Sequence, residues 1–225
     1  MNSNRTIISR RARPAKEPLS RELIVKTAYG LLKEEGMQGM SMRRVAKALD
    51  TGPSSLYVYV KNLQELNAYV MDYGLSQVVW PAPGEGTWKE DLFKAMDAYL
   101  LLLYEMPGLA ELSLTTIPMG PHALRLTEYL LGRLHEGGIT SASAAWGVDL
   151  FLFYVSSVAF EKASWNKNGT DQMSVIQAAY KSADPLQYPL IANLKEEMFS
   201  GDTESKERFR WGLEVILQGI LRTRV

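Results

Sequence analysis

The segment from Ser41 to Leu66 constrains the fold more than any other part of the chain, because it predicts two short helices separated by a tight turn. Ser41 is a favourable N-cap residue for the first of these helices. Three apolar residues, Val45, Ala46 and Leu49, then recur at helical spacing on one face. The first helix therefore has an apolar face that must be buried against other parts of the chain.

The predicted turn, Asp50-Thr51-Gly52, leads directly into the second helix. Aspartate adopts the left-handed conformation at a lower cost than most residues, and glycine adds further conformational freedom. Pro53 is favourable at the first position of a helix, which we expect to extend to about Val60. Since so short a helix is not stable alone in water, we expect Leu56 and Val60 to anchor it in a core.

Two short helices joined by a turn that contains glycine form a helix-turn-helix, whose second helix enters the major groove of DNA. The polar side chains of this segment suit that role. Hydroxyl groups bind base edges or phosphates, and a tyrosine ring packs while its hydroxyl reaches a phosphate. The predicted DNA-binding residues are Ser41, Arg43, Arg44, Pro53, Ser54, Ser55, Tyr57, Val58, Tyr59 and Lys61.

The charge distribution supports a DNA-binding front end although the net charge of the chain is zero. Residues 1–65 hold 12 Lys and Arg against 6 Asp and Glu, a net charge of +6. Residues 66–225 hold 13 against 19, a net charge of −6. A basic front end on an acidic body is typical of a DNA-binding domain joined to a second domain.

Residues 1–18 are polar and basic and contain proline, so we expect them to be disordered. Their arginines form either an arm that follows the DNA backbone or enters a minor groove, or a solvated tail with non-specific affinity alone. For specificity the tail is the favoured interpretation. The arginines in question are Arg5, Arg10, Arg11 and Arg13.

Residues 19–66 resemble the DNA-binding domain of the tetracycline-repressor (TetR) family of bacterial transcription regulators. The matching runs are MSMRRVAKAL and SSLYVYVKNLQEL, and RFRWGLEVILQGI near the C-terminus resembles the closing helix of the tetracycline-repressor-type C-terminal domain. Asp50 departs from the usual glycine of the family. Leu63 stands where many members carry a lysine, so one phosphate contact is expected to be lost. The resemblance implies an all-α fold, with a flexible basic arm (1–18), a three-helix DNA-binding domain (19–66) and a larger helical ligand-binding and dimerisation domain (67–225).

The rest of the chain also predicts helices, with no alternating pattern typical of strands. A helix from about Leu19 to Glu35 has Ser20 as its N-cap and Gly36 at its end. Asn-x-x-Glu and Thr-x-x-Glu capping boxes begin two further helices. The predicted spans are 62 to about 79, 87 to about 105, 109–115, 121–136, 142–160, 188–199 and 204–221. A polar connection is predicted at 166–185, and a short helix within it is an open alternative.

Residues 142–160 are apolar except for Asp149, and two interpretations must be weighed. This run is at the short end of the ~17–25 residues of a membrane span, and it contains a carboxylate. A helix that is apolar on nearly all sides is more often buried between other helices. We therefore predict an interior helix with Asp149 buried in it, and no membrane association.

The resemblance further implies a homodimer whose interface is a four-helix bundle, here assigned to Ala142–Trp165 and Glu204–Leu221. Two-fold symmetry then implies a palindromic DNA operator. The family's C-terminal domain holds an inducer pocket, expected here for a small, largely apolar molecule. The predicted ligand-binding residues are Phe93, Met96, Tyr99, Tyr104, Ser113, Met119, Trp146, Phe151, Tyr154 and Trp165. For each of these residues taken singly, plain core packing is the alternative.

No cofactor, metal or catalytic residue is predicted. There is no cysteine, and His122 and His135 lack a metal-binding context. Tetracycline-responsive members bind magnesium through a histidine that aligns with Ser113, so a tetracycline–magnesium inducer is not expected. Repression rather than activation, and a cytoplasmic location, follow from the resemblance. Two alternatives remain at this point: a helical enzyme, for which Asp149 is the nearest candidate group, and a protein-interaction scaffold.

Overall fold

The computed structural model describes residues 17–223 except 83, 85, 169–170 and 201–205, and it describes no side chains at 166–168 and 171–173. Within these ranges every regular element is a helix: α1 (Arg21–Glu35), η2 (Gly36–Gly39), α2 (Met42–Ala48), α3 (Pro53–Leu56), α4 (Leu63–Leu75), α5 (Trp88–Glu105), α6 (Pro107–Thr115), α7 (Pro121–Glu136), α8 (Ser141–Asn168), α9 (Asp171–Lys181), α10 (Pro189–Met198) and α11 (Glu207–Arg222). The predicted all-α fold is confirmed. The arginines of the predicted basic arm lie outside the described residues.

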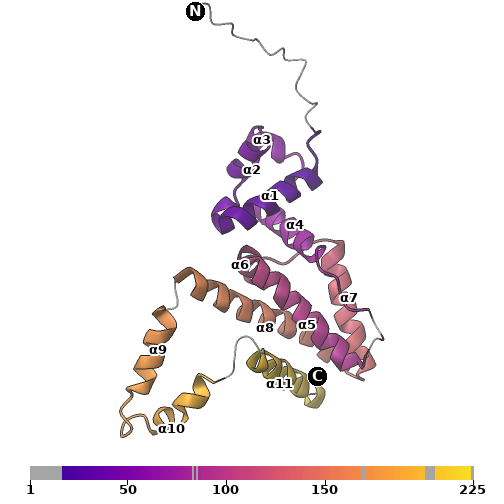
Figure 1. Cartoon of the computed structure of the whole chain (residues 1–225). Coiled ribbons are helices and arrows are strands. Elements are labelled where there is room, and N and C mark those ends of the chain that lie inside the picture. Colours follow the sequence, from indigo (N-terminus) through magenta and orange to yellow (C-terminus); the bar gives the residue numbers. More distant parts are fainter. Residues whose placement is uncertain (1–16, 83, 85, 169–170, 201–205, 224–225) are drawn as a thin grey trace, which may run out of the picture.

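The chain forms a small N-terminal head and a larger helical body (Figure 1). Helices α1, α2 and α3 make the head, and α4 leads from the head into the body. Helices α5, α6, α7, α8 and α11 pack together as the body, while α9 and α10 extend from the far end of α8 (Figure 1).

The first helix of the head has the predicted N-cap and the predicted end, although it begins at Arg21 rather than at about Leu19. The Ser20 hydroxyl accepts a hydrogen bond from the Leu23 N–H at 3.1 Å, which satisfies one of the free donors of the first turn. At the other end Gly36 has φ of 66°, a conformation that favours glycine. The buried face of α1 comprises Ile24, Val25, Ala28 and Leu32.

The turn between α2 and α3 uses Asp50, not Gly52, as its left-handed residue. Asp50 has φ of 48°, whereas Gly52 has φ of −84° and precedes Pro53 at the start of α3. The aspartate therefore supplies the positive-φ residue of the turn, at the position where the resemblance leads one to expect glycine. This explains how the chain keeps the turn despite the departure seen in its sequence.

The second helix of the motif is shorter than predicted. It ends at Leu56 instead of continuing to about Val60, because the N–H groups of Tyr59 and Val60 both donate to the Leu56 carbonyl, at 2.9 and 3.0 Å. The regular helical hydrogen-bond pattern ends at this point, and residues 57–59 form a turn. The predicted anchors are confirmed, since Leu56 and Val60 are 0% and 1% exposed.

Helix α4 also ends early, at Leu75 rather than near Val79. Its start is as predicted, with the Asn62 side chain accepting the Glu65 N–H at 2.8 Å. At its end the Ser76 hydroxyl donates to the Tyr73 carbonyl at 2.6 Å, so a side chain replaces the continuing backbone ladder. Val79 is then exposed in the linker to α5.

Helix α8 is the central helix of the body and runs well past the predicted end at Phe160. Its stretch Ser141–Trp165 is long and apolar enough to cross a membrane, with a mean hydropathy of 1.4. It packs against α5, α6, α7 and α11, which favours the predicted interior helix over a membrane span. The expectation that Asp149 is buried is wrong, because this carboxylate lies on the exposed side of α8.

Small residues on α8 and α11 bring these two helices close together. A Cβ atom at Gly147 would lie 2.8 Å from the Ile220 Cδ1 atom, and one at Gly212 would lie 2.0 Å from the Tyr154 hydroxyl oxygen. Gly147 therefore admits the close approach of α11 of the same chain.

The recognition segment, which we define as residues 53–61, should depend on its buried anchor Leu56 for stability. We expect Leu56→Ala to lower the free energy of unfolding by about 2–5 kcal/mol, because it leaves a cavity in the core of the head. The matched control is Val58→Ala, two residues away and 80% exposed, which should change stability by less than ~0.5 kcal/mol. Urea denaturation of both variants checks this, and equal losses would contradict it.

Candidate functional site

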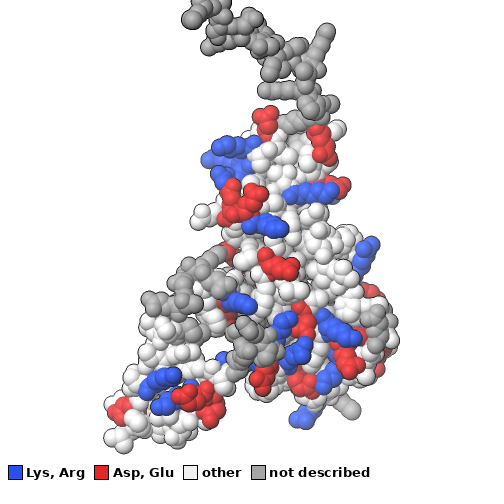
Figure 2. Space-filling view, viewed as in Figure 1, with Lys and Arg blue, Asp and Glu red and all other residues white. Residues whose placement is uncertain are grey.

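The exposed face of the helix-turn-helix carries most of the predicted DNA-binding side chains. Arg43 on α2, Ser54 on α3, and Tyr57, Val58 and Lys61 after it are all exposed. Pro53 is exposed at the start of α3 and Ser55 is half-buried. Figure 2 shows Lys and Arg side chains grouped over α2 at the left edge of the head. The structure therefore leaves these side chains accessible on the helix-turn-helix, close to a group of Lys and Arg side chains.

Ser41 and Arg44 have additional roles within the head. The Ser41 hydroxyl accepts the Arg44 N–H at 3.2 Å and so caps α2. The Arg44 guanidinium forms an ion pair with Glu35 at the end of α1. Arg44 would have to exchange this partner, or share it, in order to bind a phosphate, whereas Arg43 is exposed beside it.

Tyr59 is half-buried, and Arg21 holds it in place. The Arg21 Nε atom donates to the Tyr59 carbonyl at 3.3 Å, and its guanidinium lies 5.0 Å from the centre of the Tyr69 ring. Sequence reasoning missed Arg21, because its role depends on the packing of α1 against α4. This arginine adds a positive charge beside the recognition segment.

The Glu65 carboxylate fixes the chain just after the recognition segment. It accepts a hydrogen bond from the Lys61 N–H, one residue before the N–H that a standard capping box uses. This hydrogen bond holds the pKa of Glu65 below its ordinary value. As a result the backbone that carries Lys61 is tied to the first turn of α4.

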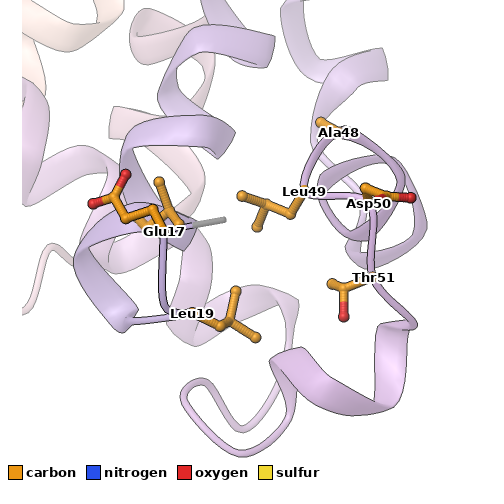
Figure 3. A pocket seen from close by; sticks show the side chains of 7 residues that line it. Glu17, Leu19, Ala48, Leu49, Asp50 and Thr51 are labelled. Carbon is orange, nitrogen blue, oxygen red and sulfur yellow. The ribbon is translucent and has the colours of Figure 1, made fainter. Parts of the chain in front are cut away.

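The pocket in Figure 3 lies in the head, between the start of α1 and the α2–α3 turn. Its lining consists of Glu17, Leu19, Leu23, Ala48, Leu49, Asp50 and Thr51. Two of these residues are acidic, so the pocket would repel a DNA phosphate. It also lies far along the chain from the predicted ligand-binding residues, and we assign no function to it.

Three predicted ligand-binding residues, Met96, Tyr99 and Phe151, meet in the buried region between α5 and α8. The Tyr99 hydroxyl lies 3.3 Å from the Ser156 hydroxyl. Burial raises the pKa of Tyr99, while hydrogen bonds with Ser156 and Ser113 act in the opposite direction. The structure thus places a polar contact between Tyr99 and Ser156 inside an apolar region, while the Ser113 hydroxyl donates to the Ala110 carbonyl at 2.8 Å.

Tyr104, Tyr154 and Trp165 are half-buried at the other end of the same region. The Lys162 ammonium lies 4.0 Å from the centre of the Tyr104 ring, a cation–π contact that the sequence alone does not indicate. Tyr154 stacks on Phe209 of α11 with ring centres 5.7 Å apart, so α11 closes this side. Tyr104 and Tyr154 therefore each combine an aromatic ring contact with a polar hydroxyl group.

Two of the predicted ligand-binding residues do not face the interior. Trp146 is 65% exposed and Met119 is 49% exposed, so the expectation that they lie on inner faces is wrong. Trp146 lies on the side of α8 that turns away from α5 and α6, and Met119 lies in the loop before α7. Phe93 is half-buried, with the Lys89 ammonium 5.6 Å from its ring centre.

Comparison with known proteins decides the family. Residues 24–68 match the family model for bacterial regulatory proteins of the tetR family, and residues 80–224 match the tetracyclin repressor-like C-terminal domain. The chain belongs to the tetracycline-repressor family. The helix-turn-helix described above is therefore the DNA-binding motif of a transcription regulator.

Relatives of this tetracycline-repressor-family protein include regulators from Streptomyces. The HTH-type transcriptional repressor DrrR1 of Streptomyces coeruleorubidus is 29% identical, over 94% of this chain and 80% of its own length. The crystal structure of apo ActR from Streptomyces coelicolor is 34% identical, with a TM-score of 0.81, covering 91% of this chain and 98% of ActR. ActR has also been solved in complex with actinorhodin, with a TM-score of 0.82 and 33% identity, at the same coverage.

The exposed side chains of the DNA-binding face should contribute directly to DNA affinity. We expect Tyr57→Ala and Arg43→Ala each to weaken binding to a cognate DNA duplex, by about 1–3 kcal/mol for a base contact, or about 5- to 150-fold. A variant that loses a phosphate contact should also show a shallower salt dependence, by about one unit of slope. Lys94→Ala, which removes an exposed cation from α5 in the body, is the matched control. Titration at two salt concentrations checks this, and unchanged affinity of both variants would contradict it.

Proposed function

We propose that this protein is a ligand-responsive transcriptional repressor that binds a palindromic operator as a homodimer. A small, largely apolar molecule bound in the body would release the operator. The observation that carries this proposal is an exposed apolar face on the two helices that the family uses for dimerisation.

The apolar face runs along α8. Trp146, Leu150, Phe153 and Phe160 are spaced by four, three and seven residues, so they share one side of the helix, and all four are exposed in the single chain. Phe153, for example, is 61% exposed. Exposed aromatic residues in such a row typically mark a protein interface.

Helix α11 extends this face, because it packs directly against α8. Its Trp211 and Val215, one helical turn apart, are exposed. Two apolar helices presented together by one copy would pair with the same two helices of a second copy, which gives a four-helix bundle about a two-fold axis. A second copy of this chain is therefore the partner that we infer for this face.

A two-fold dimer presents two DNA-binding heads related by symmetry. The half-sites of its operator would then lie about 34–36 Å apart, or a multiple of that spacing. One head alone would bind too weakly and too unselectively to find one site in a genome. The dimer therefore supplies both the affinity and the palindromic specificity of the proposed repressor, which would act in the cytoplasm.

The ligand would occupy the region bordered by Tyr99, Tyr104 and Tyr154. Apolar surroundings with a few placed polar groups are typical of small-molecule sites. The related ActR has been solved in complex with actinorhodin, which supports a ligand-binding role for this chain. A ligand that prefers a body conformation with a different position of α4 would lower the affinity for DNA by its differential affinity for the two states.

Dimerisation should depend on the apolar face of α8. We expect Phe153→Asp to shift the protein to monomers at micromolar concentration, because a charge in a buried helix interface is left unpaired. Operator affinity should fall together with the dimer. Ile117→Asp alters an apolar side chain that is still more exposed (86%) and lies in the loop between α6 and α7, so it should leave both unchanged. Sedimentation velocity decides, and a Phe153→Asp protein that stays dimeric would contradict the assignment.

Ligand binding should be coupled to operator release. Apolar compounds, with actinorhodin as the first probe, can be ranked by the increase in Tm that they produce. Those that raise Tm should also release the operator, and Tyr104→Ala should weaken both effects. A compound that raises Tm through the body but leaves operator affinity unchanged would contradict the proposed coupling.

A further inference from the structure

Helix α4 is joined to the body by a buried carboxylate. Asp72, near the end of α4, is 7% exposed. Its Oδ1 atom accepts hydrogen bonds from the N–H groups of His122 and Ala123, at 3.0 and 2.8 Å. Both N–H groups belong to the first turn of α7, some fifty residues further along the chain.

This carboxylate supplies the N-terminal cap that α7 lacks in its own sequence. The residue at the N-cap position of α7 is Gly120, which has no side chain to act as a cap, and Pro121 follows it. The next two N–H groups therefore need an acceptor from elsewhere. A negative charge at this end of a helix is also favourable, because the helix dipole is positive there.

Gly120 leaves the space that Asp72 occupies. A Cβ atom at Gly120 would lie 2.3 Å from the Asp72 Cγ atom, closer than real contacts allow. Its φ of 163° and ψ of 177° describe extended backbone that any residue adopts. The glycine is thus required by the close approach of α4, and not by its own conformation.

The neighbouring contacts between head and body are apolar and equally tight. A Cβ atom at Gly74 of α4 would lie 2.6 Å from a methyl group of Leu109, and one at Gly108 would lie 2.5 Å from a methyl group of Leu32. Apolar contacts press helices together but fix their relative rotation weakly, whereas hydrogen bonds are directional. Asp72 therefore adds the orientation that these apolar contacts do not supply.

We propose that Asp72 is a positioning residue for DNA recognition: by capping α7 it fixes the angle of α4 and hence the spacing of the two heads. This inference rests on the proposed dimer. If α4 and α7 separate, the buried Asp72 carboxylate and the two N–H groups lose their hydrogen-bond partners together. A partly separated contact between α4 and α7 is therefore unfavourable. The contact between α4 and α7 therefore favours two discrete arrangements, capped and open, over a continuous range of angles between the two helices.

The spacing of the heads can be measured directly, because the chain contains no cysteine. Glu34→Cys places one thiol on the exposed last turn of α1, and a spin label there gives a single label-to-label distance in the full-length dimer. The distance distribution and the operator affinity are then compared among the labelled parent, Asp72→Ala, Asp72→Asn and Gly120→Ala. Asp97→Asn is the control, since it breaks ion pairs to Lys206 (3.3 Å) and Arg210 (3.0 Å) within the body.

We expect a narrow distribution in the parent and in Asp97→Asn. Asp72→Ala and Gly120→Ala should broaden it and lower operator affinity at least tenfold. Asp72→Asn should be intermediate, because its amide oxygen still accepts a hydrogen bond but its charge is lost. Gly120→Ala added to Asp72→Ala should cost less than a further twofold, since the carboxylate that it would meet is gone.

A purely structural Asp72 gives a different result. In that case Asp72→Ala would lower Tm while the distance distribution and the operator affinity of the folded protein stay at the parent values, and the inference would be overturned. If Asp72→Ala does not fold, Asp72→Asn and Gly120→Ala supply the same comparison. A parent protein with no measurable label-to-label distance would overturn the dimer and this inference with it, whereas unchanged variants of a dimeric parent would overturn this inference alone.

Discussion

The structure depends on the burial of a recognition segment that cannot be stable alone. Helix α3 is four residues long, a single turn, far below the length at which a helix persists in water. Leu56 and Val60 hold it by full burial in the core that α1, α2 and α4 also form. The side chains predicted to bind DNA are therefore positioned by the core of the head, and the head is expected to move as a unit.

Helix α4 connects this rigid head to everything that could regulate it. Its first turn is tied to the recognition segment through Glu65, and its last turn is tied to α7 through Asp72. A change in the body that moves α7 therefore acts on the head through a helix with fixed contacts at both ends. Two-fold symmetry would double any such movement in the spacing between heads, which gives a buried ligand an effect on distant DNA contacts.

The sequence predicted the starts of helices reliably, because a single capping residue largely determines the backbone conformation there. Ser20, Ser41, Asn62 and Thr87 all cap the helices that they were predicted to begin, because capping is a local interaction. The predicted ends of α3 and α4 were wrong. Hydrogen bonds of a turn end α3, and the Ser76 side chain ends α4, although the apolar periodicity of the sequence continues past both points. Competition of this kind between hydrogen bonds is not visible in the spacing of apolar residues along the sequence.

Whether an apolar side chain of the body faces the interior or the exposed surface could not be predicted in the same way. Phe151 and Trp146 lie on the same nearly all-apolar helix, and only the packing of α5 and α6 shows that the first is interior and the second exposed. A face that would bind a second copy has the same composition as a face that binds the chain's own core. Asp72 was missed for a related reason, since its partners on α7 are distant in sequence and are backbone groups.

The most direct test of this account is selection of bound duplexes from a random DNA pool by the full-length protein. A dimer with two symmetric heads predicts an enriched palindrome with half-sites about one helical turn, ~34–36 Å, or a multiple apart. Enrichment of single, unpaired half-sites, or no enrichment of any sequence, would contradict it.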